Sequence, residues 1–197
     1  MLDVVGTVQA ARVRRTVAKA QSGDREAIAR LYDLYAPRVY RFALIRVESR
    51  ADAEDVLQQT FVKMIEALPR YEDRGLPFAA WLFRIARNTM IDIGRADRGH
   101  VDLGAVAEHP DDRHGPAEGV EMASDRAAIR EAVGRLTPDQ QLVIEYRFFA
   151  GLSHREIAHL MNRQEGAIRA IQFRAVQSLR DELGPLMNLT SPAEGRT

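Results

Sequence analysis

The chain has 197 residues, of which 28 are basic and 28 acidic, and this balance argues against a protein whose whole surface binds nucleic acid. The absence of cysteine from the sequence excludes disulfides and thiolate metal sites. No run of about eighteen apolar residues occurs and the first twenty residues lack the apolar core of a secretory signal, so we expect neither a membrane span nor export.

The N-terminal half of the sequence predicts a series of helices and no strand. Asp24 is a suitable N-cap for a helix that reaches about Tyr35, and Pro37 suits the first position of a second helix. Asp52 is a candidate cap for a third helix. That helix carries an apolar stripe at helical spacing, formed by Leu57, Phe61, Met64, Ile65 and Leu68.

A fourth helix is expected over residues 78–94, after a polar loop at 70–77 that contains Arg74. Its apolar face includes Phe78 and Trp81, and its opposite face carries Arg84, Arg87, Asn88 and Arg95. Aromatic rings beside a cationic helix face suit single-stranded DNA, because bases stack on the rings and arginines neutralise phosphates. The alternatives are that both aromatic residues belong to the core and that the arginines form a solvated surface.

Charge is distributed unevenly along the middle of the chain. Residues 99–125 hold seven acidic side chains and one Arg, whereas residues 74–98 hold five Arg and two Asp, and residues 147–180 hold six Arg and two Glu. The acidic stretch is also rich in Gly and Pro up to residue 119. We therefore expect a flexible acidic linker at 99–119 between two basic segments.

The C-terminal segment predicts a helix-turn-helix. A helix over residues 120–136 is followed by a helix start at Thr137, with Pro138 at its first position, and Gly151 suits a left-handed C-cap. A capping box at residues 153–156 opens a short helix, and Asn162 tolerates the positive φ of a tight turn. A long helix then covers about residues 164–183.

The outward side of this long helix carries side chains that can read base edges in a major groove: Glu165, Arg169, Gln172, Phe173 and Gln177. Arg155 and Arg174 are better placed for phosphates, which set register rather than sequence. The plainer interpretation is an ordinary helical hairpin with a solvated polar face.

An acidic and amide cluster lies at the start of the third predicted helix and comprises Asp52, Glu54, Asp55, Gln58 and Gln59. It is either a face that binds a protein partner or a set of carboxylates that complement the helix dipole. Enzyme chemistry is not expected, because the sequence has no phosphate-binding loop, nucleophile elbow or metal-binding histidine pair. We also expect no cofactor and no metal.

Taken together and in order, these segments resemble the bacterial sigma-70 family, in its extracytoplasmic-function (ECF) group. Residues 31–40 resemble region 2.1, residues 51–61 region 2.2, and residues 77–95 regions 2.3 and 2.4. Residues 136–141 and the helix-turn-helix from Leu152 resemble region 4. The resemblance covers about residues 17 to 183, which is most of the chain.

The resemblance implies roles for these surfaces. The acidic cluster would bind the clamp helices of the polymerase β′ subunit, and the helix from Pro138 would bind the β flap. Residues 70–77 and the Arg84 face would bind the promoter −10 element and hold a base flipped out of the stack. The long C-terminal helix would read the −35 element, and the linker would thread the RNA channel of the polymerase.

We therefore predict an all-α fold of two small helical domains, residues 17–98 and 120–183, with a flexible acidic linker between them and a disordered tail at 184–197. The predicted function is transcription initiation with core RNA polymerase at promoter DNA, in the bacterial cytoplasm at the nucleoid, under control of an anti-sigma factor. A stand-alone helix-turn-helix regulator would instead bind duplex DNA tightly without polymerase, and a helical adaptor would have no role on DNA.

Overall fold

A computed structural model describes residues 2–100 and 120–189, and helices dominate both ranges, in which no strand occurs. The helices before the gap form what we call the N-terminal unit: α1 (Leu2–Gln21), α2 (Arg25–Leu44), α3 (Arg50–Ala67), the 3-10 helix η1 (Leu68–Arg70) and α4 (Phe78–His100). The helices after it form the C-terminal unit: α5 (Val120–Arg135), α6 (Pro138–Ile144), the π-helix η2 (Glu145–Phe149), α7 (His154–Met161) and α8 (Glu165–Leu189).

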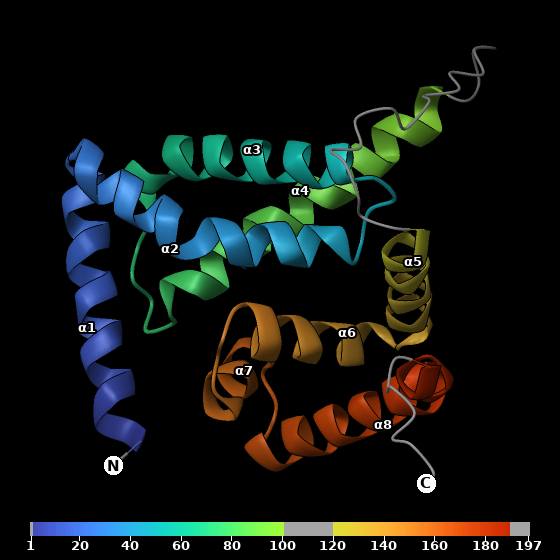
Figure 1. The fold of residues 1–197 in the computed structure, drawn as a ribbon. Helices are drawn as coiled ribbons and strands as arrows, with labels where there is room; N and C mark the ends of the chain where they lie inside the picture. Colours follow the sequence, from blue (N-terminus) through green and yellow to red (C-terminus); the bar gives the residue numbers. More distant parts are fainter. Residues whose placement is uncertain (1, 101–119, 190–197) are drawn as a thin grey trace, which may run out of the picture.

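In the N-terminal unit, α2, α3 and α4 lie side by side and α1 stands across one end of them (Figure 1). The α1 helix was not predicted, and few of its described side chains reach the core. Val17 and Ala20 are buried there. The Gln21 side chain ties the end of α1 to η1, since its Nε2 donates to the carbonyl oxygens of Leu68 at 3.2 Å and Tyr71 at 2.8 Å.

The α2 helix corrects the prediction of two helices separated at Pro37. Asp24 caps it as predicted, with its carboxylate accepting from the Ala27 N–H at 3.0 Å, but the helix continues through Pro37 to Leu44. An interior proline removes one backbone hydrogen bond and is unfavourable by about 3 kcal/mol. Burial on both sides of it outweighs this effect, because α2 buries Leu31, Tyr35, Val39 and Phe42.

The start of α3 also differs from the prediction. The N-cap is Ser49, and Asp52 is the third residue of a capping box in which the Ser49 N–H donates to the Asp52 carboxylate at 3.1 Å. The predicted apolar stripe is correct for Phe61, Met64 and Leu68, which are buried, but wrong for Ile65, which is 47% exposed. Burial on α3 is decided by where α2 and α4 pack, and periodicity alone could not locate that edge.

Local signals in the C-terminal unit are confirmed. Thr137 forms a capping box with Gln140, and Ser153 forms one with Glu156. Asn162 ends α7 in the left-handed conformation at φ 51°, and Gly151 has φ 69° in the loop before α7. These features depend on neighbouring residues only, which explains why the sequence predicts them well.

Two helix ends lie beyond the predicted positions. The α4 helix extends to His100, into the predicted linker, and α8 passes Gly184 and Pro185 and ends at Leu189, within the predicted tail. Once a helix is nucleated, each added residue gains a backbone hydrogen bond, so helices run past single unfavourable residues. The rest of the predicted linker and tail, residues 101–119 and 190–197, lies outside the described residues.

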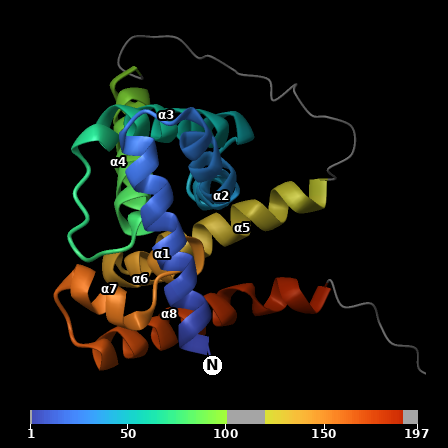
Figure 2. The ribbon, with the colours of Figure 1, turned by 90° about the vertical axis from the view of Figure 1, so that its left-hand side faces the viewer.

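The two units pack against each other rather than standing apart, as the two views in Figures 1 and 2 show. One apolar core runs through both of them. At the junction, the Phe42 ring of α2 contacts Phe83 of α4 and Phe149 of η2, with ring centroids 5.5 and 5.7 Å apart. The sequence predicts each unit, but it contains no signal for this contact.

Candidate nucleic-acid interface

The helix-turn-helix is formed by α7, the turn at Asn162 and α8. Its inner side is apolar, because Ile157 of α7 and Ile168 and Ile171 of α8 are buried. The tight turn is closed by the Arg163 N–H, which donates to the Ala158 carbonyl at 2.9 Å. Packing on one side leaves the opposite side of α8 free for a ligand.

Four of the predicted recognition residues on α8, Arg169, Phe173, Arg174 and Gln177, are exposed, as is Arg155 on α7. Phe173 is 71% exposed, so its ring is available to a ligand on this face. Arg169 pairs with Glu165 one turn before it at 2.5 Å, so its guanidinium is held over the helix surface. This face offers guanidinium, amide and aromatic groups, the groups that read base edges in a major groove.

Gln172 is half-buried, and its placement depends on a residue that sequence analysis did not single out. The Nε2 of His154, at the start of α7, lies 2.6 Å from the Oε1 of Gln172. When this nitrogen carries the proton, the Gln172 amide oxygen is engaged and its NH₂ group remains available as a donor. No local signal predicts this pair, because the two residues are 18 positions apart in sequence.

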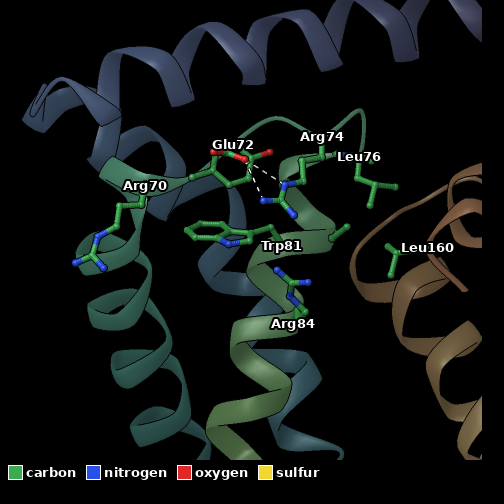
Figure 3. A pocket seen from close by; sticks show the side chains of 10 residues that line it. Arg70, Glu72, Arg74, Leu76, Trp81, Arg84 and Leu160 are labelled. Atoms are coloured by element: carbon green, nitrogen blue, oxygen red, sulfur yellow. Dashed lines mark hydrogen bonds and ion pairs between the residues drawn. The ribbon is translucent and has the colours of Figure 1, made fainter.

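A pocket of about 300 Å³ lies beside the first turns of α4 (Figure 3). It is lined by Arg70, Tyr71, Glu72, Arg74, Leu76, Pro77, Ala80, Trp81, Arg84 and Leu160. Most of these residues belong to the predicted DNA-binding loop and to α4. Leu160, however, comes from α7 of the other unit and forms one side of the pocket in Figure 3.

Burial distinguishes the two interpretations of Phe78 and Trp81, as core residues or as DNA contacts. Phe78 is only 4% exposed and is therefore a core residue in this structure, contrary to its prediction as a DNA contact. Trp81 is half-buried, and its ring packs on Tyr71 at 4.8 Å and on Phe78 at 5.3 Å between centroids. Burial raises the pKa of the Tyr71 hydroxyl, and the nearby Asp73 carboxylate raises it further. The exposed part of Trp81 is thus a stacking surface supported from below.

The charged residues around the pocket are not equally free. Arg84 and Asn88 are exposed on α4, and Arg74 is exposed in the loop, where its Nη2 pairs with Glu72 at 3.0 Å. Arg87 is half-buried beside the C-terminal unit. The side chain of Arg95 lies outside the described part of α4.

The acidic cluster lies on the first half of α3. Its members Glu54, Asp55, Gln58 and Gln59 are exposed. Asp52 differs, because it is half-buried and occupied by its capping box with Ser49. Further along α3, Val62 is 55% exposed and Ile65 is exposed as well, so the polar cluster continues into an apolar patch that the sequence pattern had assigned in part to the core.

None of the helices within the described ranges combines the length and apolar character needed to cross a membrane.

Family models match both units. The model described as Sigma-70 region 2 matches residues 31–99, and the model described as Sigma-70, region 4 matches residues 132–181. The first match covers most of α2, all of α3 with the acidic cluster, and nearly all of α4. The second covers the helix-turn-helix.

Curated relatives are similar over most of the chain. The ECF RNA polymerase sigma factor BldN of Streptomyces coelicolor is 37% identical over 171 residues, which cover 86% of this chain and 65% of BldN. The ECF RNA polymerase sigma factor SigD of Mycobacterium tuberculosis is 34% identical over 184 residues, covering 90% of this chain and 86% of SigD. ShbA of Streptomyces griseus, also named as an ECF RNA polymerase sigma factor, is 34% identical, with coverages of 91% and 97%.

Two solved structures share the fold. The structure of CnrH in complex with the cytosolic domain of CnrY matches with a TM-score of 0.60 and 27% identity, covering 90% of this chain and 98% of that chain. The sigma factor RpoE of Bartonella quintana, crystallised with the anti-sigma factor NepR, matches with a TM-score of 0.54 and 25% identity, with coverages of 79% and 96%.

Proposed function

This chain belongs to the ECF group of the sigma-70 family, and we propose that it selects promoters through the exposed face of α8 and the pocket beside α4. As a sigma factor it binds core RNA polymerase and directs promoter-specific initiation of transcription. The family consists of initiation factors rather than enzymes, and we infer that this chain has no catalytic activity of its own. The stand-alone regulator is not favoured, because the curated relatives are named as sigma factors.

The observation that carries the proposal is that one chain has two surfaces suited to two different forms of DNA, duplex and single strand. The α8 face, with Arg169, Phe173 and Gln177, suits the base edges of an intact duplex at the −35 element. The α4 pocket, with Trp81 and Arg84, suits an unstacked base and its phosphates at the −10 element. A protein that both locates and melts a promoter needs both.

The other predicted DNA-binding residues have different roles in this proposal. Arg155 and Arg174 contact phosphates that set the register of α8, and Glu165 and Gln172 shape the base-reading surface. Around the α4 pocket, Arg74, Asn88 and Arg95 contact the single strand. Arg87 joins them only when it is released from the C-terminal unit, and Phe78 supports the Trp81 ring from the core.

We propose that the acidic cluster is the surface that binds the polymerase β′ clamp helices, with Glu54, Asp55, Gln58 and Gln59 as direct contacts. Asp52 supports this surface by capping α3. The helix from Pro138 is the proposed contact of the β flap. The relatives of known structure were solved with CnrY and NepR, and an anti-sigma factor is the corresponding regulatory partner of this chain. We place the protein in the bacterial cytoplasm, at the nucleoid.

A run-off transcription assay with bacterial core RNA polymerase and genomic DNA tests the function. Adding the chain should produce transcripts from a restricted set of start sites that core enzyme alone does not use. The triple variant Arg84→Ala, Arg87→Ala, Arg169→Ala should lose these transcripts while still binding core enzyme. The matched control replaces three exposed arginines on α1 and α2, Arg15, Arg25 and Arg41, and should transcribe normally. Transcription by the first triple variant at the wild-type level would contradict the proposal.

A further inference from the structure

We propose that α1 is a positioning element for promoter opening. Through Gln21 and Arg14 it holds residues 71–77, which we call the pocket loop, in the shape that captures an unstacked −10 base. This inference rests on the proposed function of the α4 pocket and adds to it a helix that precedes the family match, since the Sigma-70 region 2 model begins at residue 31. Neither Gln21 nor Arg14 lines the pocket, so both act through the loop rather than on DNA.

The pocket loop connects η1 to α4, and most of its residues line the pocket. Among the described residues, no backbone–backbone hydrogen bond involves residues 72–76. The contacts within the loop come from side chains. Arg74 Nη2 pairs with Glu72 at 3.0 Å, as drawn in Figure 3, and the Gly75 N–H donates to the Asp73 carboxylate at 3.0 Å. Exposed contacts of this kind contribute little, so the loop needs support from another element to keep one shape.

Gln21, the last residue of α1, fixes the start of the pocket loop. Its half-buried amide donates to the Tyr71 carbonyl oxygen at 2.8 Å and to the Leu68 carbonyl oxygen at 3.2 Å. The Tyr71 ring in turn packs against Trp81, with the ring centroids 4.8 Å apart. A change at Gln21 therefore reaches the proposed stacking surface through one intervening residue.

Arg14 holds the middle of the same loop. Its Nε lies 3.0 Å from the Asp73 Oδ2, while the other oxygen of this carboxylate accepts from the Gly75 N–H at 3.0 Å. Gly75 has φ 78°, so the carboxylate and a left-handed glycine together define the turn of the loop. The ion pair is partly exposed and contributes little by itself. Reversal of the Arg14 charge, however, would set one carboxylate against another.

The α1 helix is a firm base for both contacts, because it is anchored in the core. Val17 and Ala20 are buried there with Leu31 of α2. In Figure 1, α1 stands across one end of the neighbouring helices. Arg14 and Gln21 are about two helical turns apart and support the loop at two separate points. A loop held in this way loses less conformational entropy when it binds a ligand, which strengthens binding.

Base capture is the step that this support should affect. Unstacking a base is unfavourable, and a pocket already in its binding shape offsets more of that energy. Recognition of duplex DNA by α8 does not involve the pocket loop. Loss of the support should therefore weaken promoter opening and leave binding to the −35 element unchanged.

The first measurement follows the pocket loop in the full-length free chain. Trp81 is the only tryptophan in the sequence, so its fluorescence reports how its ring packs beside the loop. Gln21→Leu keeps a side chain of similar size and removes the donor, and Arg14→Glu sets a second carboxylate against Asp73. Both should increase the quenching of Trp81 by acrylamide. Arg15→Glu, the same charge change at the neighbouring exposed position, is the matched control and should behave as wild type.

The second measurement is the capture of a fluorescent base in the −10 element by holoenzyme assembled from each chain and core polymerase. A loop that holds the productive shape only one time in ten should capture the base roughly tenfold more weakly. Gln21→Leu and Arg14→Glu should each lose roughly threefold to tenfold in base capture. Arg14→Lys keeps a positive charge beside Asp73 and should retain most of it. The affinity of every holoenzyme for duplex −35 DNA should stay at the wild-type value.

Base capture at the wild-type level by both Gln21→Leu and Arg14→Glu would overturn the inference, and so would an equal loss in Arg15→Glu. If thermal unfolding shows that Gln21→Leu does not fold, the exposed substitution Arg14→Glu decides alone. Failure of the proposed function is distinguishable, because Trp81→Ala would then capture the base as well as wild type does.

Discussion

The two proposed DNA surfaces of this sigma factor differ in what holds them in place. The α8 face is built from local elements, namely the Ser153 capping box and the left-handed turn at Asn162, and its cations are exposed. The α4 surface depends on contacts distant in sequence, because Leu160 completes its pocket and Glu145 lies near Arg87. The comparison indicates that duplex recognition is preformed, whereas access to the single strand depends on how the two units are arranged.

The largest expected effect on this comparison is a pH dependence of the packing between the two units, which we call closed while Phe42 contacts Phe149 and open when the units are apart. Burial raises the pKa of Glu145 from 4.5 to about 7 in the closed chain, while Arg46 and Arg87 facing it from α2 and α4 partly offset the shift. Tyr146, the neighbouring titratable group, has its own pKa raised by burial. A raised pKa means that the closed chain binds the proton more tightly than the open chain, so its extra stability is complete below about pH 4.5 and lost as pH rises through 7.

The shift of the Glu145 pKa corresponds to about 3 kcal/mol between the two pH limits. The distance between spin labels at Glu66→Cys on α3 and Ser178→Cys on α8, measured by pulsed electron spin resonance from pH 5 to pH 8, should therefore move from closed to open in the otherwise unaltered chain. Glu145→Gln cannot titrate and should stay closed over this range, and Glu131→Gln on the exposed side of α5 is the matched control. A distribution that stays constant with pH in wild type would contradict this expectation.

Replacement of Arg169 should produce the next largest effect. Loss of a bidentate base contact costs about 1–3 kcal/mol of discrimination, which is roughly a fivefold to 150-fold loss of −35-dependent transcription. Arg169→Ala should leave the free chain's affinity for a single-stranded oligonucleotide with the promoter −10 sequence unchanged. Arg25→Ala, an exposed arginine on α2, serves as the control. An equal loss on promoters with and without a −35 element would show that Arg169 does not read sequence.

Trp81→Ala tests the proposed single-strand surface in the α4 pocket. Base stacking on an aromatic side chain contributes about 1–3 kcal/mol per base, so holoenzyme with this variant should open promoters poorly while still binding duplex −35 DNA. Trp81→Phe keeps a ring packed on Tyr71 and should retain most of the opening, measured with a fluorescent base in the −10 element. Normal opening by Trp81→Ala would assign Trp81 to the core alone.

A smaller effect is expected from the cap that positions α7. Ser153→Ala removes a side chain that accepts from the Glu156 N–H at 3.2 Å, and N-cap losses cost about 1 kcal/mol. Thermal unfolding should shift down by a few degrees, whereas Ser178→Ala on the exposed side of α8 should leave it unchanged. No shift for Ser153→Ala would show that tertiary packing, rather than the cap, defines the start of α7.

The smallest effect should come from His154. His154→Ala releases the Gln172 amide, and one neutral hydrogen bond contributes about 1 kcal/mol. We expect a loss of at most about fivefold in −35 affinity, confined to the base pair that Gln172 contacts. Gln172→Ala should give the same altered specificity, and the double variant should add nothing further. Additive losses would place the two residues in separate roles.

Much of this architecture follows from the sequence because its signals are local. Capping boxes, a left-handed asparagine and apolar spacing predict α6, α7 and α8, and the aromatic and arginine pattern predicts both faces of α4. The positions of Thr137, Ser153 and Asn162 are confirmed for this reason. A hydrogen bond between a side chain and a backbone group three residues away depends on little beyond the segment itself.

Tertiary structure alone decided where these elements meet. Ile65 lies at the edge of the core rather than within it, α2 passes through Pro37 because packing on both sides stabilises it, and Phe78 supports Trp81 from below. Above all, Glu145 is an ordinary acidic residue in the sequence and becomes a buried carboxylate between two units in the fold. Burial and charge pairing depend on residues about a hundred positions away, and no local pattern encodes those neighbours.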